Sequence, residues 1–209
     1  MAEKETEITI YAKIGDFNGF TEAHSKEHHY QVEGKFSTGK KVRTRKTTKE
    51  DGTESFVLTI KIENSDNGHA ASRVEHNINI DEEFFNAFKQ CAEKAVKKTR
   101  YFFYSNNTVL KKQDNGEDQD IKLPDLIYQV DVYETTDGKQ VDWCKIDIEL
   151  DKLMEYMKAN HSDIKNLKFN VSVEHLPFKP TESIVSTTED DEQKARLNSI
   201  WDTFNQKPM

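Results

Sequence analysis

Apolar and ionisable residues alternate along most of this chain, which is the pattern of strands in a one-sided antiparallel sheet. The clearest case is residues 128–151, where Asp137-Gly138 lies between two alternating runs. Asp-Gly is a common hairpin turn. Asp131 in the first run and Glu149 in the second then lie on a polar face, while valines and isoleucines lie on the other. The sequence therefore predicts a β-hairpin with one apolar face and one acidic face.

The same alternation predicts strands along the rest of the chain, joined by polar turns. They lie within residues 1–17, 28–36, 41–46, 56–62, 72–80, 96–104 and 168–178. Helical spacing of apolar residues predicts helices after Asp81, over residues 151–159 and over residues 189–205. The polar segment 18–28 and the pair His28-His29 suggest a solvated loop, and residues 111–125 suggest an exposed loop or ragged hairpin.

The composition is polar for a globular protein, because 34% of the 209 residues are hydrophobic and 33% are charged. The net charge of −8 argues against non-specific binding of nucleic acid. The two cysteines, Cys91 and Cys144, fit neither a metal site nor a disulfide framework, so a reducing compartment is expected. We see no signal-peptide pattern and no apolar run long enough for a membrane span, and we expect a cytoplasmic protein with no membrane partner.

Two arrangements explain strands that are apolar on one face and ionisable on the other. The charged faces can lie in water, or several of them can converge on an enclosed, wet interior. An antiparallel sheet of eight or nine strands tends to close. We therefore predict an α+β, mainly β protein: a closed antiparallel β-barrel tunnel of eight or nine strands with helices packed outside. Residues 1–180 would form this tunnel domain, and residues 181–209 a C-terminal polar segment with an amphipathic helix that packs on the barrel or plugs it.

Charges of both signs would line the interior, and together they indicate one class of ligand. Arg and Lys bind phosphates, and clustered carboxylates bind hard cations such as Mg²⁺ or Mn²⁺. The predicted phosphate-binding residues are Lys35, Arg43, Arg45, Lys61, Arg73, Lys98 and Arg100. The acids on the same faces are Glu5, Glu7, Glu33, Glu75, Asp131, Asp147 and Glu149. This lining suits a complex of a divalent metal with a polyphosphate.

Six segments, taken in order, resemble motifs of the CYTH superfamily of triphosphate tunnel metalloenzymes. The segments VRTR, FVLTIK and SRVEHN resemble its Arg-x-Arg, Leu-Thr-x-Lys and Arg-x-Glu-x-Glu strands. VKKTRY, YQVDVY and KIDIEL resemble its Lys-x-Arg, aromatic-Glu-x-Asp and Glu-x-Glu strands. The resemblance covers most of residues 5–150 and implies an eight-stranded tunnel. The chain departs from the pattern at Thr9, where the family has a lysine, and at Asn77 and Gln129, where it has carboxylates.

The resemblance implies a divalent-metal-dependent triphosphatase that acts on inorganic tripolyphosphate or on an organic or nucleoside triphosphate. Catalysis would rest on Glu149, Asp147, Glu7 and Lys61, and Mg²⁺ or Mn²⁺ would be held by Glu5, Glu7, Glu75, Asp131, Asp147 and Glu149. Three alternatives remain open: adenylyl cyclisation of the class IV type, hydrolysis of RNA 5′-triphosphate ends, and non-catalytic binding of a nucleotide or polyphosphate. The expected partner is thus a small-molecule triphosphate or nucleotide, and nucleic acid is expected only as a 5′-triphosphate RNA end.

Overall fold

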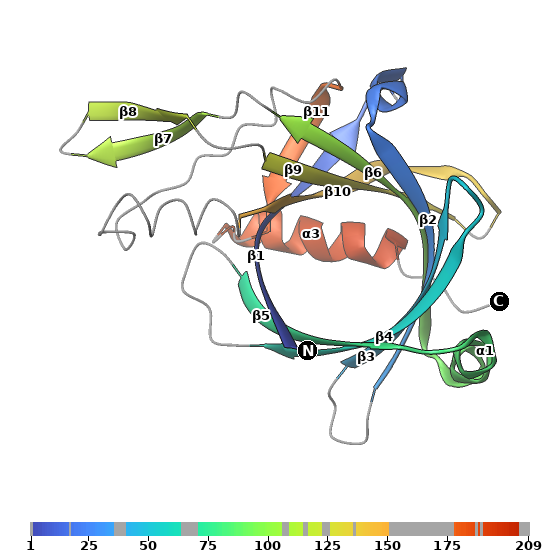
Figure 1. Cartoon of the computed structure of the whole chain (residues 1–209). Coiled ribbons are helices and arrows are strands. Elements are labelled where there is room, and N and C mark those ends of the chain that lie inside the picture. The colour runs from blue at the N-terminus through green and yellow to red at the C-terminus, as the bar shows by residue number, and fades with distance from the viewer. Residues whose placement is uncertain are drawn as a thin grey trace.

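The structure of the protein is a computed structural model, and it describes most of the chain. The described residues are 2–16, 18–35, 41–63, 71–105, 109–114, 117–122, 126–135, 137–150, 178–186, 188 and 190–204. Within these ranges the chain is mainly β, with one 3-10 helix and two α-helices (Figure 1). The predicted helix over residues 151–159 and most of the predicted strand over residues 168–178 lie outside the described residues.

Nine strands form one large antiparallel sheet. They are β1 (Ala2–Ile14), β2 (Ser25–Lys35), β3 (Lys41–Lys49), β4 (Glu54–Glu63), β5 (Ala71–Asn79), β6 (Lys94–Ser105), β9 (Leu126–Glu134), β10 (Gln140–Glu149) and β11 (Pro180–Val185). Their order in the sheet is β10-β9-β6-β2-β3-β4-β5-β1-β11, and β10 also pairs with β1. The sheet therefore curls round and has a concave and a convex face (Figure 1).

Strand β1 has three partners. Along one edge its residues 7–13 pair with β10, and along the other edge residues 2–7 pair with β5 and residues 10–14 pair with β11. Away from this sheet, β7 (Val109–Asp114) and β8 (Glu117–Lys122) pair with each other as a two-stranded ribbon. This ribbon is the ragged hairpin that we gave as one option for residues 111–125.

The two α-helices follow the local signals that predicted them, whereas the 3-10 helix was not predicted. Helix α1 (Glu82–Cys91) begins at Asp81, whose side chain accepts a hydrogen bond of 2.7 Å from the backbone N–H of Phe84. This bond satisfies one of the free N–H groups of the first turn. Helix α3 (Asp191–Phe204) lies near the end of the chain, and the 3-10 helix η1 (Asn18–Glu22) lies within the segment predicted as a loop.

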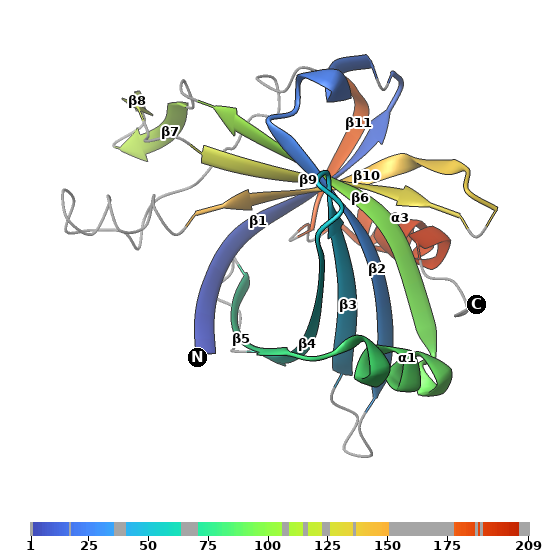
Figure 2. The same cartoon turned by 45° about the vertical axis from the view of Figure 1, so that its right-hand side comes forward.

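The two α-helices lie on opposite faces of the sheet. Phe85 of α1 packs with Val32 and Ala95 on the convex face. Phe204 of α3 packs with Tyr133 on the concave face. Figure 1 accordingly shows α3 within the curve of the sheet, and Figure 2 shows α1 at another end of it, apart from α3.

The predicted fold class, a closed eight-stranded barrel with its helices outside, is wrong, because the sheet curls but is not closed into a barrel. The main sheet has nine strands and ends on β11, which pairs with β1 beside the curled part of the sheet. In addition, α3 lies on the concave face, so the helices described are not all outside. The physical reason is that Tyr11 and Tyr133 alternate with the apolar residues of their strands as charged residues do, yet they offer α3 an aromatic surface. The coarser class, mainly β with some helix, stands.

Candidate anion-binding site

Strand pairing gathers the charged residues of distant segments on the concave face. Residues directly opposite each other on neighbouring strands share a face. Arg100 lies opposite Asp131, and Asp131 lies opposite Lys145. Asp147 lies opposite Gln129 on one side and Thr9 on the other. One row of the sheet thus brings together residues that are up to 138 positions apart in the chain.

Asp131 is the centre of a buried ion-pair network. It is fully buried and accepts bonds from Arg100, with Nε to Oδ1 at 2.7 Å and Nη2 to Oδ2 at 2.8 Å. The ammonium of Lys98 donates to the same carboxylate. Burial alone would raise the pKa of Asp131, but Arg100 and Lys98 outweigh it and hold the pKa well below its ordinary value. Asp131 is therefore a carboxylate, held by a bidentate arginine and a lysine.

Asp147 forms a second ion pair beside the first. Its Oδ1 accepts a bond of 2.6 Å from the hydroxyl of Thr9, and its Oδ2 accepts one from the ammonium of Lys145. Arg100 Nη2 lies 3.9 Å from Asp147 Oδ2 and links the two pairs. Burial raises the pKa of Asp147, but Lys145 and Arg100 lower it, and the balance is below the ordinary value. Both buried aspartates therefore neutralise lysines and an arginine of the protein itself.

Among the cations of the network, Lys98 is the one whose charged form is destabilised. Lys98, Arg100 and Lys145 form ion pairs with the two aspartates, and Glu7 also favours the charged form of Lys145. Burial lowers the pKa of Lys98, Asp131 raises it, and Arg100 and Lys145 lower it again, so that it lies at about 7. A further anion on this face would stabilise the charged ammonium.

Strand β3 adds two arginines whose guanidinium groups are incompletely bonded. The Nε atoms of Arg43 and Arg45 are buried, and neither has a hydrogen-bond partner among the described residues. Burial lowers the pKa of Arg45 to about 10, and repulsion from Arg43 and Arg100 adds to this effect. A buried donor without an acceptor costs free energy. Arg43 and Arg45 therefore offer donors and positive charge to an anionic ligand.

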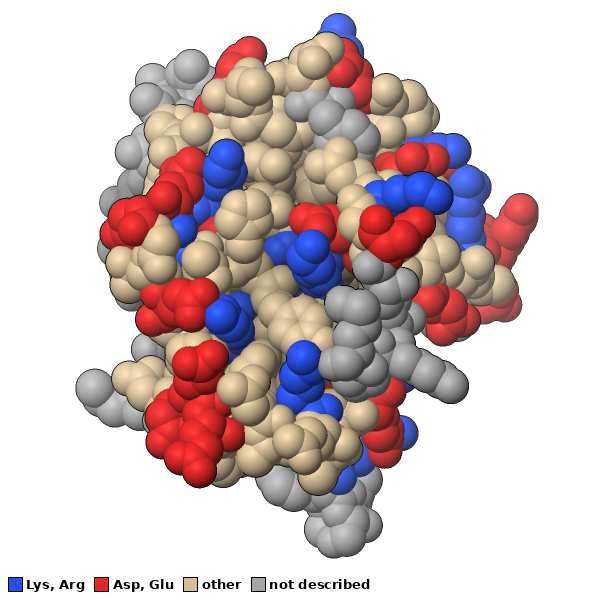
Figure 3. Space-filling model, turned by 90° about the vertical axis from the view of Figure 1, so that its right-hand side faces the viewer, with Lys and Arg blue, Asp and Glu red and all other residues tan. Residues whose placement is uncertain are grey.

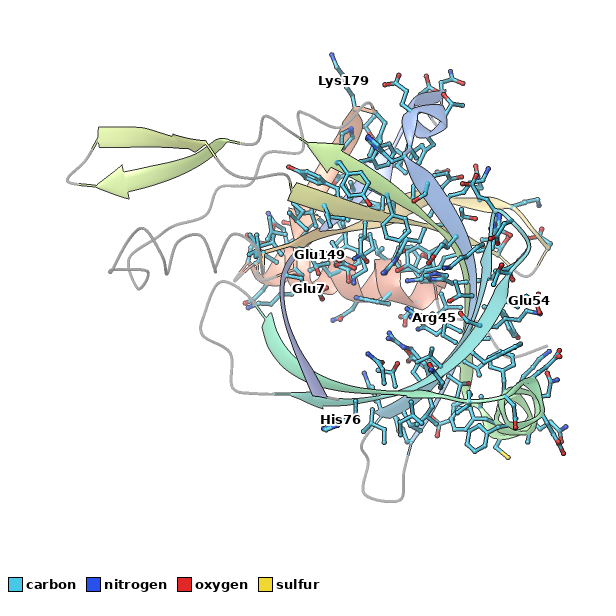
Figure 4. All side chains as sticks on the ribbon, in the orientation of Figure 1. Glu7, Arg45, Glu54, His76, Glu149 and Lys179 are labelled. Atoms are coloured by element: carbon cyan, nitrogen blue, oxygen red, sulfur yellow. The ribbon has the colours of Figure 1, made fainter. Side chains whose placement is uncertain are left out.

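Two acids, Glu7 and Glu149, lie together on the part of the concave face formed by β1 and β10. Glu7 lies directly opposite Glu149 across β1 and β10. Gln129 connects this pair to the network, because its carbonyl accepts from Arg100 and its amide donates to Glu149. In Figure 4, Glu7 and Glu149 lie together near β1, and Arg45 lies on the other side of the curve. The concave face thus carries one carboxylate pair at β1 and β10, and other acids beside the arginines, since Glu33 lies directly opposite Arg43 across β2 and β3.

Helix α3 borders the charged network with an aromatic layer. Phe204 is 1% exposed and stacks on Tyr133, with ring centroids 3.7 Å apart. It also stacks on Tyr11 at 6.4 Å, and Trp201 meets Tyr11 edge to face. The ammonium of Lys98 lies 5.9 Å from the Tyr133 ring centroid. The helix therefore excludes water from one side of the network, which strengthens the electrostatic interactions within it.

The remaining predicted site residues differ in how far the structure describes them. Lys35 is exposed and lies 3.8 Å from Glu93 at the end of β2, so it does not join the network. Glu33, on the same face, accepts a bond of 3.1 Å from Gln31. The backbone register pairs Lys61 with Glu75, and Arg73 with Glu5 and Glu63. The side chains of Glu5, Lys61, Arg73 and Glu75 lie outside the described part of the structure.

The metal prediction receives no support from the described side chains. They contain no group of three or more His, Cys, Asp or Glu residues with the geometry to hold a metal ion. Asp131 and Asp147, both predicted ligands, are instead bonded to cationic side chains. Glu7 and Glu149 are the other two described carboxylates of that set, and they lie opposite each other on β1 and β10. Two carboxylates with water are enough to begin a Mg²⁺ or Mn²⁺ site when substrate phosphates complete it.

Sequence reasoning missed the pair of His29 and Glu27. The structure places His29 within β2, 2% exposed, and not in a solvated loop. Its Nε2 atom lies 3.1 Å from Glu27 Oε2. The signal that could have found it is the alternation of Glu27, His29, Gln31 and Glu33, which puts all four on one face. Lys145 was also overlooked as a site residue, although it alternates with Asp147.

The outer surface is mixed in charge. On the face shown in Figure 3, Lys and Arg side chains run down the middle, and Asp and Glu side chains gather towards the left and right borders. Ion pairs such as Lys46 with Glu54, at 2.8 Å, belong to the convex side of the sheet. Pairs of this exposed kind contribute little to stability. The buried network on the concave face is therefore the distinctive electrostatic feature of the molecule.

Comparison with known proteins leaves the family open. No protein-family model matches the chain, and no curated protein matches its sequence. The resemblance to the CYTH superfamily therefore stays a prediction that rests on the motifs. Among the described residues, no helix combines the length and the apolar character that a membrane span requires.

Proposed function

We propose that this protein binds a triphosphate, inorganic or as part of a nucleotide, on the concave face of its sheet. The observation that carries the proposal is the pair of buried, unbonded Nε atoms of Arg43 and Arg45, both among the described residues. Guanidinium groups bind phosphate oxygens bidentately and keep their charge. Burial lowers the pKa of Arg45, repulsion from Arg43 and Arg100 lowers it further, and this concentration of positive charge favours a ligand with several negative charges.

The proposal is tested by titrating the protein with tripolyphosphate and with ATP at pH 7.5, without divalent metal, by calorimetry. Saturable binding at micromolar to low millimolar concentration is expected, and Arg45→Met should weaken it at least about tenfold. Lys46→Met is the matched control, because Lys46 is the next residue of β3 and faces the other way, towards Glu54. Equal binding by both variants and the parent protein, or no saturation by the parent, would reject the proposal.

A second candidate function is hydrolysis of that triphosphate with Mg²⁺ or Mn²⁺. It is favoured by the position of Glu7 opposite Glu149, across the concave face from Arg45. A triphosphate held by the arginines would complete the coordination of a cation held by these glutamates, and such a cation neutralises charge in phosphoryl transfer. The motif resemblance to triphosphate tunnel metalloenzymes points in the same direction.

One panel of substrates distinguishes hydrolysis of the triphosphate from binding without turnover. Tripolyphosphate, ATP, thiamine triphosphate and 5′-triphosphate RNA are each incubated with Mg²⁺ or Mn²⁺, and both orthophosphate and cyclic nucleotide are measured. Orthophosphate release that stops with EDTA supports hydrolysis, and cyclic nucleotide would instead support adenylyl cyclisation. Binding without any product would leave the protein as a non-catalytic triphosphate binder. Such a role suits a cytoplasmic protein, which is the compartment that we propose from the free thiols of Cys91 and Cys144.

A further inference from the structure

His29 and Glu27 form a hydrogen-bonded pair between the ion-pair network and the unbonded arginines. His29 lies directly opposite Lys98 on β6 and opposite Thr47 on β3. Glu27 lies opposite Arg100 and Lys49. The bond between His29 Nε2 and Glu27 Oε2 is 3.1 Å long. The pair therefore sits among the residues that we propose as phosphate ligands, yet its function is not explained by their interactions.

The bond to Glu27 determines which nitrogen of His29 carries the hydrogen. The hydrogen bond to His29 lowers the pKa of Glu27, so Glu27 is a carboxylate and can only accept. Nε2 of His29 must then donate, and Nδ1 of the neutral ring is left with a lone pair. Nδ1 is buried and has no hydrogen-bond partner among the described residues. The ring thus presents an unused basic nitrogen on the concave face.

Burial, and after it the cations around His29, explain why this nitrogen is unprotonated. The charged groups near it are Glu27 on β2, Arg45 and Lys49 on β3, Lys98 and Arg100 on β6, and Asp131 on β9. Burial lowers the pKa of His29, the bond to Glu27 raises it, and Lys98, Arg100 and Arg45 lower it, to about 4. Three cations therefore oppose protonation, and they are groups whose charge a bound triphosphate would neutralise.

We propose that His29 is a further phosphate-binding residue whose Nδ1 takes up one proton from solvent when a triphosphate binds. The imidazolium then donates through Nδ1 to a phosphate oxygen, and Glu27 accepts from Nε2. This inference rests on the proposed binding of a triphosphate. A polyanion placed against Arg45 and Lys98 would offset the repulsion that these cations exert on a protonated His29, and opposite charge nearby favours the charged ring. The only bond formed is N–H, and the proton comes from the buffer.

Protonation on ligand binding would give both nitrogens of the buried His29 ring a hydrogen-bond acceptor. A neutral imidazole that accepts through Nδ1 cannot bond to an ionised phosphate, which is itself an acceptor. Once protonated, the ring has two donors, and both have acceptors: Glu27 at Nε2 and phosphate at Nδ1. The long side chain of Lys98 lies opposite His29 on β6, and its movement onto a phosphate would expose Nδ1 to the same ligand.

The experiment counts protons during binding. Tripolyphosphate is titrated into the parent protein and into His29→Gln at pH 5.5, in buffers of different ionisation enthalpy, by calorimetry. Because both proteins bind the same ligand, the ionisation of tripolyphosphate itself cancels in the difference. We expect the parent to take up roughly half a proton or more per ligand beyond His29→Gln. The dissociation constant of the parent should also rise with pH between 5 and 6.5 relative to that variant, by up to about tenfold per pH unit.

Two controls make the result specific. His28→Gln removes the neighbouring histidine, which is exposed and whose Nδ1 lies 3.0 Å from Thr99 Oγ1, and it should leave the proton uptake unchanged. Glu27→Gln keeps His29 but removes the carboxylate that stabilises the imidazolium, so it should reduce the uptake even if His29→Gln folds poorly. Equal proton counts in the parent, His29→Gln and Glu27→Gln overturn this inference alone. Absence of binding by the parent at both pH 7.5 and pH 5.5 overturns the proposed function with it.

Discussion

Arg45→Met is expected to make the protein more stable and less able to bind its ligand. In the parent protein the Arg45 guanidinium is largely buried near Arg43 and Arg100, and its Nε has no partner among the described residues. Methionine keeps much of the aliphatic length and removes both the charge and the unsatisfied donor. The residue would thus be one that is retained for binding at a cost in stability.

The magnitude follows from the pKa of Arg45, which burial and its arginine neighbours lower to about 10. At about 1.4 kcal/mol per pH unit, this corresponds to at most about 3.5 kcal/mol against the charged side chain. Partial exposure to solvent reduces that figure, so we expect a stabilisation of about 1–3 kcal/mol. For a chain of this length, 1 kcal/mol changes the melting temperature by about 2–4 °C. The variant should therefore melt roughly 3–10 °C above the parent.

The assay is thermal unfolding followed by circular dichroism, with and without tripolyphosphate. A ligand at one hundred times its dissociation constant stabilises the folded parent by about 2.7 kcal/mol, whereas Arg45→Met should gain far less. The difference in melting temperature should then shrink or reverse. Lys46→Met, on the convex side of the same strand, should change stability by no more than about 0.5 kcal/mol. A lower melting temperature for Arg45→Met than for Lys46→Met, without ligand, would refute the reasoning.

Further predictions concern catalysis, pH and packing. If the protein hydrolyses triphosphates, Glu149→Gln should lower kcat by about 10²–10³-fold with little loss of stability, and normal turnover would make Glu149 a structural acid. The folded-state pKa of His29, about 4, is below its unfolded value, so the unfolded chain binds more protons than the folded chain between pH 6.5 and 4. The stability of the protein must therefore fall as the pH falls through this range. The loss from His29 is about 3 kcal/mol, and urea unfolding of His29→Gln should show a shallower pH dependence. Phe204→Ala should cost about 3–5 kcal/mol in urea unfolding, because the ring is buried against Tyr133; a loss below 1 kcal/mol would show that α3 contributes little to the fold.

Local patterns in the sequence were sufficient to assign side chains to faces of the sheet. Strand alternation correctly placed Arg100, Asp131 and Asp147 together, because the direction of a side chain on a strand depends only on its position in that strand. The start of α1 at Asp81 was also predictable, since the cap and the first turn are neighbours in the chain. The turn at Asp137-Gly138 was predictable for the same reason. Gly138 adopts the left-handed backbone conformation that this turn requires, with φ of 80°.

Tertiary structure alone decided which charges meet and what covers them. Asp131 and Asp147 suggested metal ligands, but pairing across the sheet brings Arg100 of β6 to both of them, and that pairing depends on the register between strands. The concave position of α3 depends on Tyr133 and Phe204, which are 71 positions apart by number. His29 was equally hidden, because burial and the field of neighbouring cations are properties of the assembled sheet and not of the residues beside it in the chain.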